Sequence, residues 1–339
     1  MLVVGMPSPS RHIMIFCLPL AAAVLAGCGG DLYAKRIITP DAAGGRLSED
    51  LAGTGEKLVS EKRIDLARRI DAPDGTPLDV WVIKGRRPAP DSSRAEPGKA
   101  VVILHGLGES KANYLGIAQR LARPRAPEAG LDVVLIDLRA HGRSGGDYFT
   151  YGGLEKLDVK AVVDALAADK TIAPDEVYVL GVTLGGATAI QYAAADPRVK
   201  GVMAVAPYKD ARSFARWRMF ISDPAMSEAD FAKNLSRAGE LAHFDPDDAS
   251  ALKAARTATC PLLLVHSTLD MAVPFDHSKA IYEAWRGPRK LEALVPGQEQ
   301  IVWLVWDEWV AKAVAEMARG NLETPLPTTR TATAPAAPR

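Results

Sequence analysis

Four short stretches of this sequence carry side chains that can act as nucleophile, acid or base, and three of the four also contain glycine. Each stretch carries an imidazole, a hydroxyl or a carboxylate, the groups that proteins use for proton transfer and nucleophilic attack, and each follows a short apolar run. Ligands of open α/β sheets bind at the carboxyl ends of the strands. The candidates for one functional site are therefore His105–Gly108, Asp137–Gly146, Gly181–Gly186 and His266–Asp270.

The apolar runs before these stretches have the length and continuity of buried parallel strands. We expect strands at Ala100–Leu104, Val133–Ile136, Val177–Leu180 and Leu262–Val265, weaker ones at Val199–Val205 and Leu291–Val295, and one next to the sheet edge at Leu78–Ile83. Helical patterns separate them at Tyr114–Leu121, Val159–Ala168, Ala187–Ala195, Ser278–Trp285 and Trp306–Met317. This alternation predicts an α/β fold with a doubly wound, mostly parallel sheet and helices on both faces.

The composition excludes several classes of function. The 339 residues carry 41 Lys and Arg against 41 Asp and Glu, so no large basic surface for nucleic acid is expected. Three cysteines, Cys17, Cys28 and Cys260, are too few for a disulfide scaffold. The sequence has no metal-ligand cluster, phosphate loop or Walker pattern, so it implies no cofactor and no metal.

The N-terminus has the pattern of a secretory signal. A basic flank precedes the apolar stretch Ile13–Leu25, which is too short to span a bilayer. The stretch ends in Leu25-Ala26-Gly27-Cys28, which resembles the lipobox of bacterial lipoproteins, where the cysteine becomes the lipid-modified first residue. We expect a lipid on Cys28 that anchors the protein in the cell envelope, on the outer side of the cytoplasmic membrane or in the outer membrane. The alternative is an ordinary cleaved signal in which Cys28 is incidental.

The remaining boundaries follow from composition. Residues 1–27 are the signal peptide, 28–60 a Gly/Ala-rich tether, and 321–339 a disordered tail rich in Thr, Pro and Ala. The folded unit is then one domain over residues 61–320. Within it, the segment at about 209–258 mixes Trp217, Phe220 and Phe244 with many charges, and we expect it to form a helical cap above the site.

At these stretches the chain resembles the α/β-hydrolase superfamily, most closely its serine-peptidase-like and esterase-like branch. The resemblance runs from about Ile64 to Ala318 and implies the α/β-hydrolase fold with a nucleophile, an acid and a base. It rests on four features in register: His105-Gly106, the loop from Asp137 through Arg139 and His141 to Ser144, Tyr151-Gly152 with Glu155 and Asp158, and the glycine turn at 181–185.

The resemblance assigns roles to three residues, two of which depart from the family. The family's nucleophile is a serine in a Gly-x-Ser-x-Gly elbow between a strand and a helix. Thr183 stands at that place in Gly181-Val182-Thr183-Leu184-Gly185. Asp270 corresponds to the acid. The base, a histidine after the last strand, is replaced by Gln300, and an amide cannot take up a proton near neutral pH.

Other parts of the expected machinery are less affected by these replacements. The backbone N–H groups of Leu107 and Leu184 correspond to the oxyanion hole, which does not depend on the side chains. His105, His141 and His266, near the ends of strands, and Glu299, beside Gln300, remain open as relocated bases, with structural roles as the alternative.

A second stretch matches the residue types of the elbow motif but lacks the strand and helix that should flank it. Gly142-Arg143-Ser144-Gly145-Gly146 begins several residues after its strand and is followed by no helical pattern. The elbow is a tight turn from strand to helix, so we interpret Ser144 as a loop residue.

Three functions remain open. The first is a membrane-anchored lipoprotein of hydrolase fold that is catalytically impaired and binds a small molecule, a peptide or an envelope partner. The second is an active ester or peptide hydrolase that uses Thr183 with a relocated base. The third is a surface interaction module. The replacements at Thr183 and Gln300 favour the first and the third.

Overall fold

The computed structural model describes residues 31–41, 43–87, 98–124, 130–295 and 306–323. Within residues 43–49, the side chains of residues 43, 44, 46, 47 and 49 are not part of this description. Cys28, Glu299, Gln300 and the tail from residue 324 lie outside the described residues.

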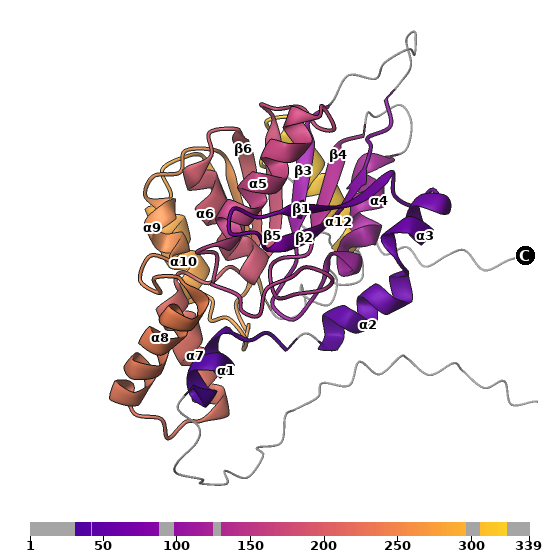
Figure 1. Ribbon diagram of the computed structural model, residues 1–339. Helices are drawn as coiled ribbons and strands as arrows, with labels where there is room; N and C mark the ends of the chain where they lie inside the picture. The colour runs from indigo at the N-terminus through magenta and orange to yellow at the C-terminus, as the bar shows by residue number, and fades with distance from the viewer. Residues whose placement is uncertain (1–30, 42, 88–97, 125–129, 296–305, 324–339) are drawn as a thin grey trace, which may run out of the picture. The chain divides into compact units, whose positions relative to one another are not determined.

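The centre of the fold is an eight-stranded sheet in the order β1-β2-β4-β3-β5-β6-β7-β8. The strands are β1 (Leu66–Asp71), β2 (Pro77–Ile83), β3 (Ala100–Leu104), β4 (Asp132–Ile136), β5 (Val177–Val182), β6 (Val199–Val205), β7 (Leu262–Ser267) and β8 (Arg289–Leu294). The pairs β1–β2 and β2–β4 are antiparallel, and the other five pairs are parallel. The predicted α/β fold with a mostly parallel sheet is confirmed (Figure 1).

Helices follow the strands and pack on both faces of the sheet. They are α1 (Leu32–Ile38), α2 (Ala43–Ala52), α3 (Gly55–Ser60), α4 (Leu115–Ala122), α5 (Glu155–Ala168), α6 (Leu184–Ala195), α7 (Ala211–Ser222), α8 (Glu228–Ala242), α9 (Ala251–Ala255), α10 (Asp276–Ala284) and α12 (Trp306–Ala318). Side chains of β3 alternate between the two faces. Val102 and Leu104 pack with α5 and α6, whereas Val101 and Ile103 pack with α4 and α12.

Three helices, α7, α8 and α9, lie between β6 and β7, in the segment where a cap is expected. Phe214 and Met219 of α7 and Phe231 and Leu235 of α8 are buried, so both helices pack their apolar sides into the core. Among the described residues, no helix is long and apolar enough to cross a membrane.

The segment predicted as a tether differs from that prediction. Residues 31–60 contain α1, α2 and α3, and α1 lies beside α7 and α8 (Figure 1). Ala34, Ile37 and Ile38 of α1 are fully buried or nearly so. Their spacing of three and four residues places them on one side of a helix, and this short apolar stripe outweighs the Gly/Ala-rich composition around it.

Candidate functional site

Thr183 lies at the sharp turn between β5 and α6. Its backbone has φ 48° and ψ −100°, a conformation that a β-branched residue adopts only under strain. Two glycines make the turn possible. A Cβ at Gly181 would lie 2.1 Å from Gly185 O, and a Cβ at Gly185 would lie 2.1 Å from Leu104 O. The glycine turn therefore has the strand-to-helix geometry that presents a side chain above the sheet.

The Thr183 backbone is fixed by hydrogen bonds, whereas its hydroxyl has no partner among the described residues. The residue is partly exposed, while the backbone is fixed because Thr183 N–H donates to Val205 O at 2.8 Å and Ala187 N–H donates to Thr183 O at 3.0 Å. Within the described part of the chain, no group forms a hydrogen bond with Thr183 Oγ1. The hydroxyl therefore has no described base to take its proton.

The backbone N–H groups of Leu107 and Leu184 are the donors that we expect to form an oxyanion hole. Leu184 is the first residue of α6, and Leu107 lies in the loop after β3. Neither N–H donates to an acceptor among the described residues. The loop and the turn are joined because Gly185 N–H donates to His105 O at 3.1 Å.

Glu109 holds the loop that carries Leu107. Its Oε2 accepts hydrogen bonds from Gly106 N–H at 2.8 Å and from the Tyr114 hydroxyl at 2.6 Å. Burial and the neighbouring Glu109 raise the pKa of Tyr114 well above its ordinary value, so this hydroxyl stays a donor. The loop geometry is thus set by groups other than Leu107 itself.

Asp270 lies in the loop after β7 with one fifth of its side chain exposed. Its Oδ1 accepts from Ala272 N–H at 2.7 Å and from Val273 N–H at 2.8 Å, and its Oδ2 lies 3.5 Å from His266 Nε2. Burial acts to raise the pKa of Asp270, but the hydrogen bonds from His266 and the two N–H groups outweigh it, so the pKa is lowered. Asp270 is therefore ionised at neutral pH and can accept a further hydrogen bond.

His105 and His266, two of the alternative bases, are buried and bonded inside their own loops. His105 Nδ1 lies 2.8 Å from Gly106 O, and its Nε2 accepts from Leu138 N–H at 3.0 Å. Burial and the adjacent His141 hold the pKa of His105 well below its ordinary value. His266 Nδ1 lies 2.7 Å from Ser278 Oγ and its Nε2 lies 2.9 Å from Val273 O.

His141 and His277 are likewise engaged away from Thr183. His141 Nδ1 lies 2.9 Å from Arg139 O, while Nε2 is buried and has no partner among the described residues. Burial lowers the pKa of His141. His277 Nδ1 accepts from Lys209 N–H at 3.1 Å. Across the described ranges, then, no histidine nitrogen bonds to the Thr183 hydroxyl, and Gln300 and Glu299 lie outside those ranges.

Ser144 has both hydrogen-bonding functions of its hydroxyl committed. Its Oγ donates to Asp137 O at 2.6 Å and accepts from Asp79 N–H at 2.8 Å. The same loop is held by Asp137, whose carboxylate accepts from the backbone N–H groups of Lys111 and Arg143, both at 2.8 Å. Ser144 therefore braces the loop, as its position in the sequence predicts.

The N-terminal segment, which sequence reasoning did not place near the site, lies against its loops. Gly45 N–H donates to Gly108 O at 2.9 Å, and Phe149 N–H donates to Ile38 O at 3.0 Å. Gly108 has φ +78°, and a Cβ on it would lie 2.5 Å from Asp41 O. Asp41 and Gly45 therefore pack directly on the loop that carries Leu107. The apolar stripe of α1 is the only signal that could have indicated this docking.

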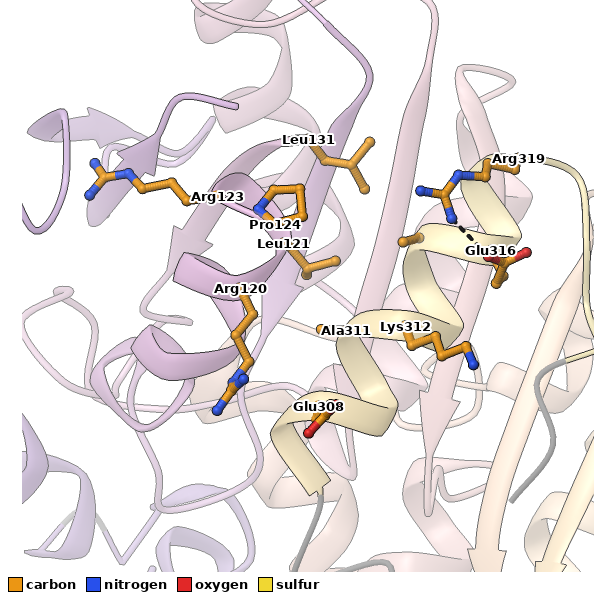
Figure 2. A pocket seen from close by; sticks show the side chains of 11 residues that line it. Arg120, Leu121, Arg123, Pro124, Leu131, Glu308, Ala311, Lys312, Glu316 and Arg319 are labelled. Atoms are coloured by element: carbon orange, nitrogen blue, oxygen red, sulfur yellow. Dashed lines mark hydrogen bonds and ion pairs between the residues drawn. The ribbon is translucent and has the colours of Figure 1, made fainter. Parts of the chain in front are cut away.

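A separate groove of about 450 Å³ lies between α4 and α12 (Figure 2), and Thr183 is not among its lining residues. Leu121, Leu131 and Ala311 line it, and the charged pair Glu316 and Arg319 stands at its edge with 2.7 Å between the two side chains. None of its lining residues belongs to the loops at the carboxyl ends of the strands. Within the described residues, no group of three His, Cys, Asp or Glu side chains is arranged to hold a metal.

Comparisons with known proteins point to one superfamily. The model of the serine aminopeptidase family S33 matches residues 95–241. The protein YqkD of Bacillus subtilis is 30% identical over 217 residues, which are 62% of this chain and 66% of that protein. A monoacylglycerol lipase of Mycolicibacterium smegmatis is 34% identical over 121 residues, 35% of this chain and 37% of the lipase. The match therefore spans about two thirds of the Bacillus protein and about one third of the lipase.

Solved structures support the same fold. A Pyrococcus furiosus esterase superimposes with a TM-score of 0.56 at 21% identity, over 80% of this chain and 97% of the esterase. A puromycin hydrolase superimposes with a TM-score of 0.55 at 18% identity, over 77% of this chain and 40% of that protein. At such identities the likeness concerns the fold.

Proposed function

Because this chain is a member of the α/β-hydrolase superfamily, we propose that it binds a small molecule, a peptide or an envelope partner at the site around Thr183, with impaired hydrolytic activity. One observation carries this proposal. Among the described residues, no imidazole nitrogen bonds to the Thr183 hydroxyl. His105, His266 and His277 bond to other groups, and His141 bonds to Arg139 O through Nδ1 while its Nε2 is buried. A mid-chain threonine without a neighbouring base is a weak nucleophile.

The site still has features that favour binding of a carbonyl or carboxylate group. The N–H groups of Leu107 and Leu184 have no acceptor among the described residues, and such donors attract an oxygen that carries negative charge. A hydrolase that loses its triad keeps about 10³- to 10⁴-fold acceleration over water from its oxyanion hole and from binding. That remainder is too small for a dedicated hydrolase.

The proposal includes a lipid anchor. The lipobox-like Leu25-Ala26-Gly27-Cys28 supports lipidation of Cys28, which would hold the protein on the outer side of the cytoplasmic membrane or in the outer membrane. Mass spectrometry of the membrane fraction should find a mature chain that begins at Cys28 with diacylglyceryl and acyl additions. A soluble mature protein with another first residue would refute the anchor.

Two measurements test the binding role. Thr183 should not react with a fluorophosphonate probe under conditions that label a known serine hydrolase completely. Fatty acids, monoacylglycerols or short peptides should raise the melting temperature of the protein, and Leu184→Pro, which removes the N–H without a charge change, should abolish that rise. A well-folded protein that reacts stoichiometrically with the probe at Thr183 is an active enzyme, and the proposal is then wrong.

One observation favours an active hydrolase as a second candidate. The strained conformation of Thr183 and the open donors of Leu107 and Leu184 are features that catalysis needs and simple binding does not. In that case the base would come from the segment that contains Glu299 and Gln300. Turnover of p-nitrophenyl butyrate that disappears in Thr183→Ala would support it.

A further inference from the structure

The N-terminal end of the described chain is bound tightly to the cap helices. Asp31 forms an ion pair with Arg237 of α8 at 2.7 Å. Ile37 O accepts hydrogen bonds from the Tyr151 hydroxyl at 2.6 Å and from Arg218 of α7 at 3.1 Å. With α1 docked in this way, no slack tether separates the cap from the residues before Asp31.

This docking limits how far the cap can stand from a lipid on Cys28. Three residues of chain, even fully extended, reach only about 10 Å from Cys28 to Asp31. Asp31 itself is fixed to α8. A lipid anchor at Cys28 would therefore hold the α7–α8 end of the domain close to the membrane surface.

An exposed apolar surface lies at this end of the domain. We call it the cap face, and it consists of Trp217, Phe220, Ile221, Leu269 and Met271. Two elements far apart in sequence form it: α7, and the loop after β7 that also carries Asp270. Trp217 joins them, because its Nε1–H donates to Met271 O at 3.3 Å and its ring stacks on Phe220 with 6.2 Å between centroids.

Four apolar side chains of the cap face are strongly exposed to solvent. Phe220 is 48% exposed, Ile221 62%, Leu269 60% and Met271 81%. Scattered exposed apolar residues are normal, but a contiguous group marks a surface that meets a membrane or a partner. Helix α1 lies beside α7 and α8, and the Asp223 carboxylate, which follows α7, raises the pKa of Tyr33 in α1. Asp31, which comes three residues after Cys28 in the sequence, therefore lies at the same end of the domain as the end of α7.

We propose that the cap face rests in the interface of the lipid bilayer, with Ile221, Leu269 and Met271 inserted among the acyl chains. The inference rests on the proposed lipid anchor for its geometry and on the exposed side chains for its chemistry. Leu269 and Met271 flank Asp270 in the sequence, so this orientation turns the Asp270 side of the site toward the membrane. The site would then exchange its ligand with the lipid phase, and the ligand would be an amphiphile with an acyl chain.

The experiment uses the lipidated mature protein in phosphatidylcholine vesicles, part of whose acyl chains are brominated. Ile221→Cys, Met271→Cys and the control Leu157→Cys are each made with Cys260→Ser and labelled with a polarity-sensitive fluorophore. Leu157 is 41% exposed on α5 and is not part of the cap face. We expect a blue shift, a several-fold rise in emission and quenching by bromine at positions 221 and 271, and none of these at 157.

The outcomes separate this inference from the proposed anchor. If positions 221 and 271 stay as accessible to aqueous iodide as position 157, the cap face does not touch the bilayer and the inference is wrong. Mass spectrometry of the same sample reports the state of Cys28. If Cys28 carries no lipid, the anchor fails, and vesicles added to the same variants, made with Cys17→Ser and Cys28→Ser so that one thiol remains, test the cap face alone: the same blue shift supports it, and an unchanged spectrum refutes it.

Discussion

Two hydroxyl side chains of this protein stand in the same glycine pattern and have opposite surroundings. Ser144, in Gly142–Gly146, donates to Asp137 O and accepts from Asp79 N–H, so its oxygen is fully used. Thr183, in Gly181–Gly185, has a positive φ, leads directly into α6 and has no described partner for its hydroxyl. A string of residue types identifies a catalytic turn only when the strand and the helix around it are also present.

The loop around Ser144 and the turn around Thr183 are also held in place by different groups. The loop around Ser144 is held by a dense polar network, in which the fully buried Lys111 pairs with Asp137 at 2.5 Å and with Asp79 at 2.8 Å. The turn around Thr183 is held by backbone hydrogen bonds, from Thr183 N–H to Val205 O and from Ala187 N–H to Thr183 O. The backbone geometry of the turn therefore does not depend on the side chain at position 183.

The largest expected effect restores the chemistry at Thr183. Thr183→Ser removes the methyl group, and Gln300→His supplies a base in the family's usual place. Because triad members act as a unit, either change alone should have little effect, whereas the pair should raise p-nitrophenyl acetate turnover by about 10²-fold or more. Turnover of the wild type, both single variants and the double variant is the measurement.

Two results would contradict this expectation. A wild type that already reaches the rate of the double variant has a relocated base. A double variant that is folded but inert has a remodelled site. Adding Ser144→Ala to the double variant should leave turnover unchanged, because Ser144 serves its loop.

The turn itself should be intolerant of side chains. A Cβ at Gly185 would lie 2.1 Å from Leu104 O and 2.7 Å from His105 O, which are backbone atoms that cannot yield. Gly185→Ala should therefore lower the free energy of unfolding by about 2 to 3 kcal/mol, measured by urea denaturation. Gly116→Ala is the matched control, since its added Cβ meets only the flexible Asp307 side chain. Equal stability of the two variants would disprove the steric account.

Replacing Ser144 should lower the free energy of unfolding more than replacing Thr183 does, although only Thr183 lies at the candidate site. Ser144→Ala leaves the Asp79 N–H and the Asp137 carbonyl without their partner and should cost about 1 to 2 kcal/mol. Thr183→Ala removes a hydroxyl without a described partner and should change stability by no more than about 0.5 kcal/mol. Thermal or urea unfolding of the two variants is sufficient. A larger loss at Thr183 than at Ser144 would mean that the Thr183 hydroxyl has a structural role.

The smallest expected effect is on the pH dependence of stability and comes from His277, a histidine with a structural role. Burial and the nearby Lys209 lower the pKa of His277 from 6.5 to about 4. Between these values the unfolded chain binds a proton that the folded protein does not, so stability falls as the pH is lowered from 6.5 to 4. His277→Asn keeps an acceptor for Lys209 N–H and should reduce this loss by about 1 kcal/mol. His243→Asn, at an exposed position, is the control, and an identical pH dependence in all three proteins would refute the assignment.

The sheet was predictable where its strands are buried on both faces. Continuous apolar runs such as Ala100–Leu104 and Val199–Val205 coincide with β3 and β6 because parallel strands covered by helices have no polar face. The edge strand β1 was missed. Its sequence, Leu66–Asp71, carries Arg68 and Arg69 and is mostly exposed or half-buried, so it lacks that signal.

The site was predictable in part. Strand ends located Thr183, Asp270 and the loop of Leu107, because these positions follow directly from the order of strands. The hydrogen bonds of His105 and His266 were not predictable, since they involve Leu138, Ser278 and Val273 in loops whose conformation depends on tertiary contacts. The docking of α1 was also missed, because a seven-residue helix gives a weak periodic signal.

The docking of α1 has a consequence for the order of folding. The Ile37 carbonyl bonds to Tyr151 and Arg218, which lie 114 and 181 residues later in the chain. Contacts between such distant residues form late, because the loop that they close costs entropy until the intervening sheet is in place. A chain synthesised from its N-terminus presents α1 first, yet α1 packs on α7 and α8, which come much later in the sequence. The first helix of the domain to be made is therefore among the last to reach its native position.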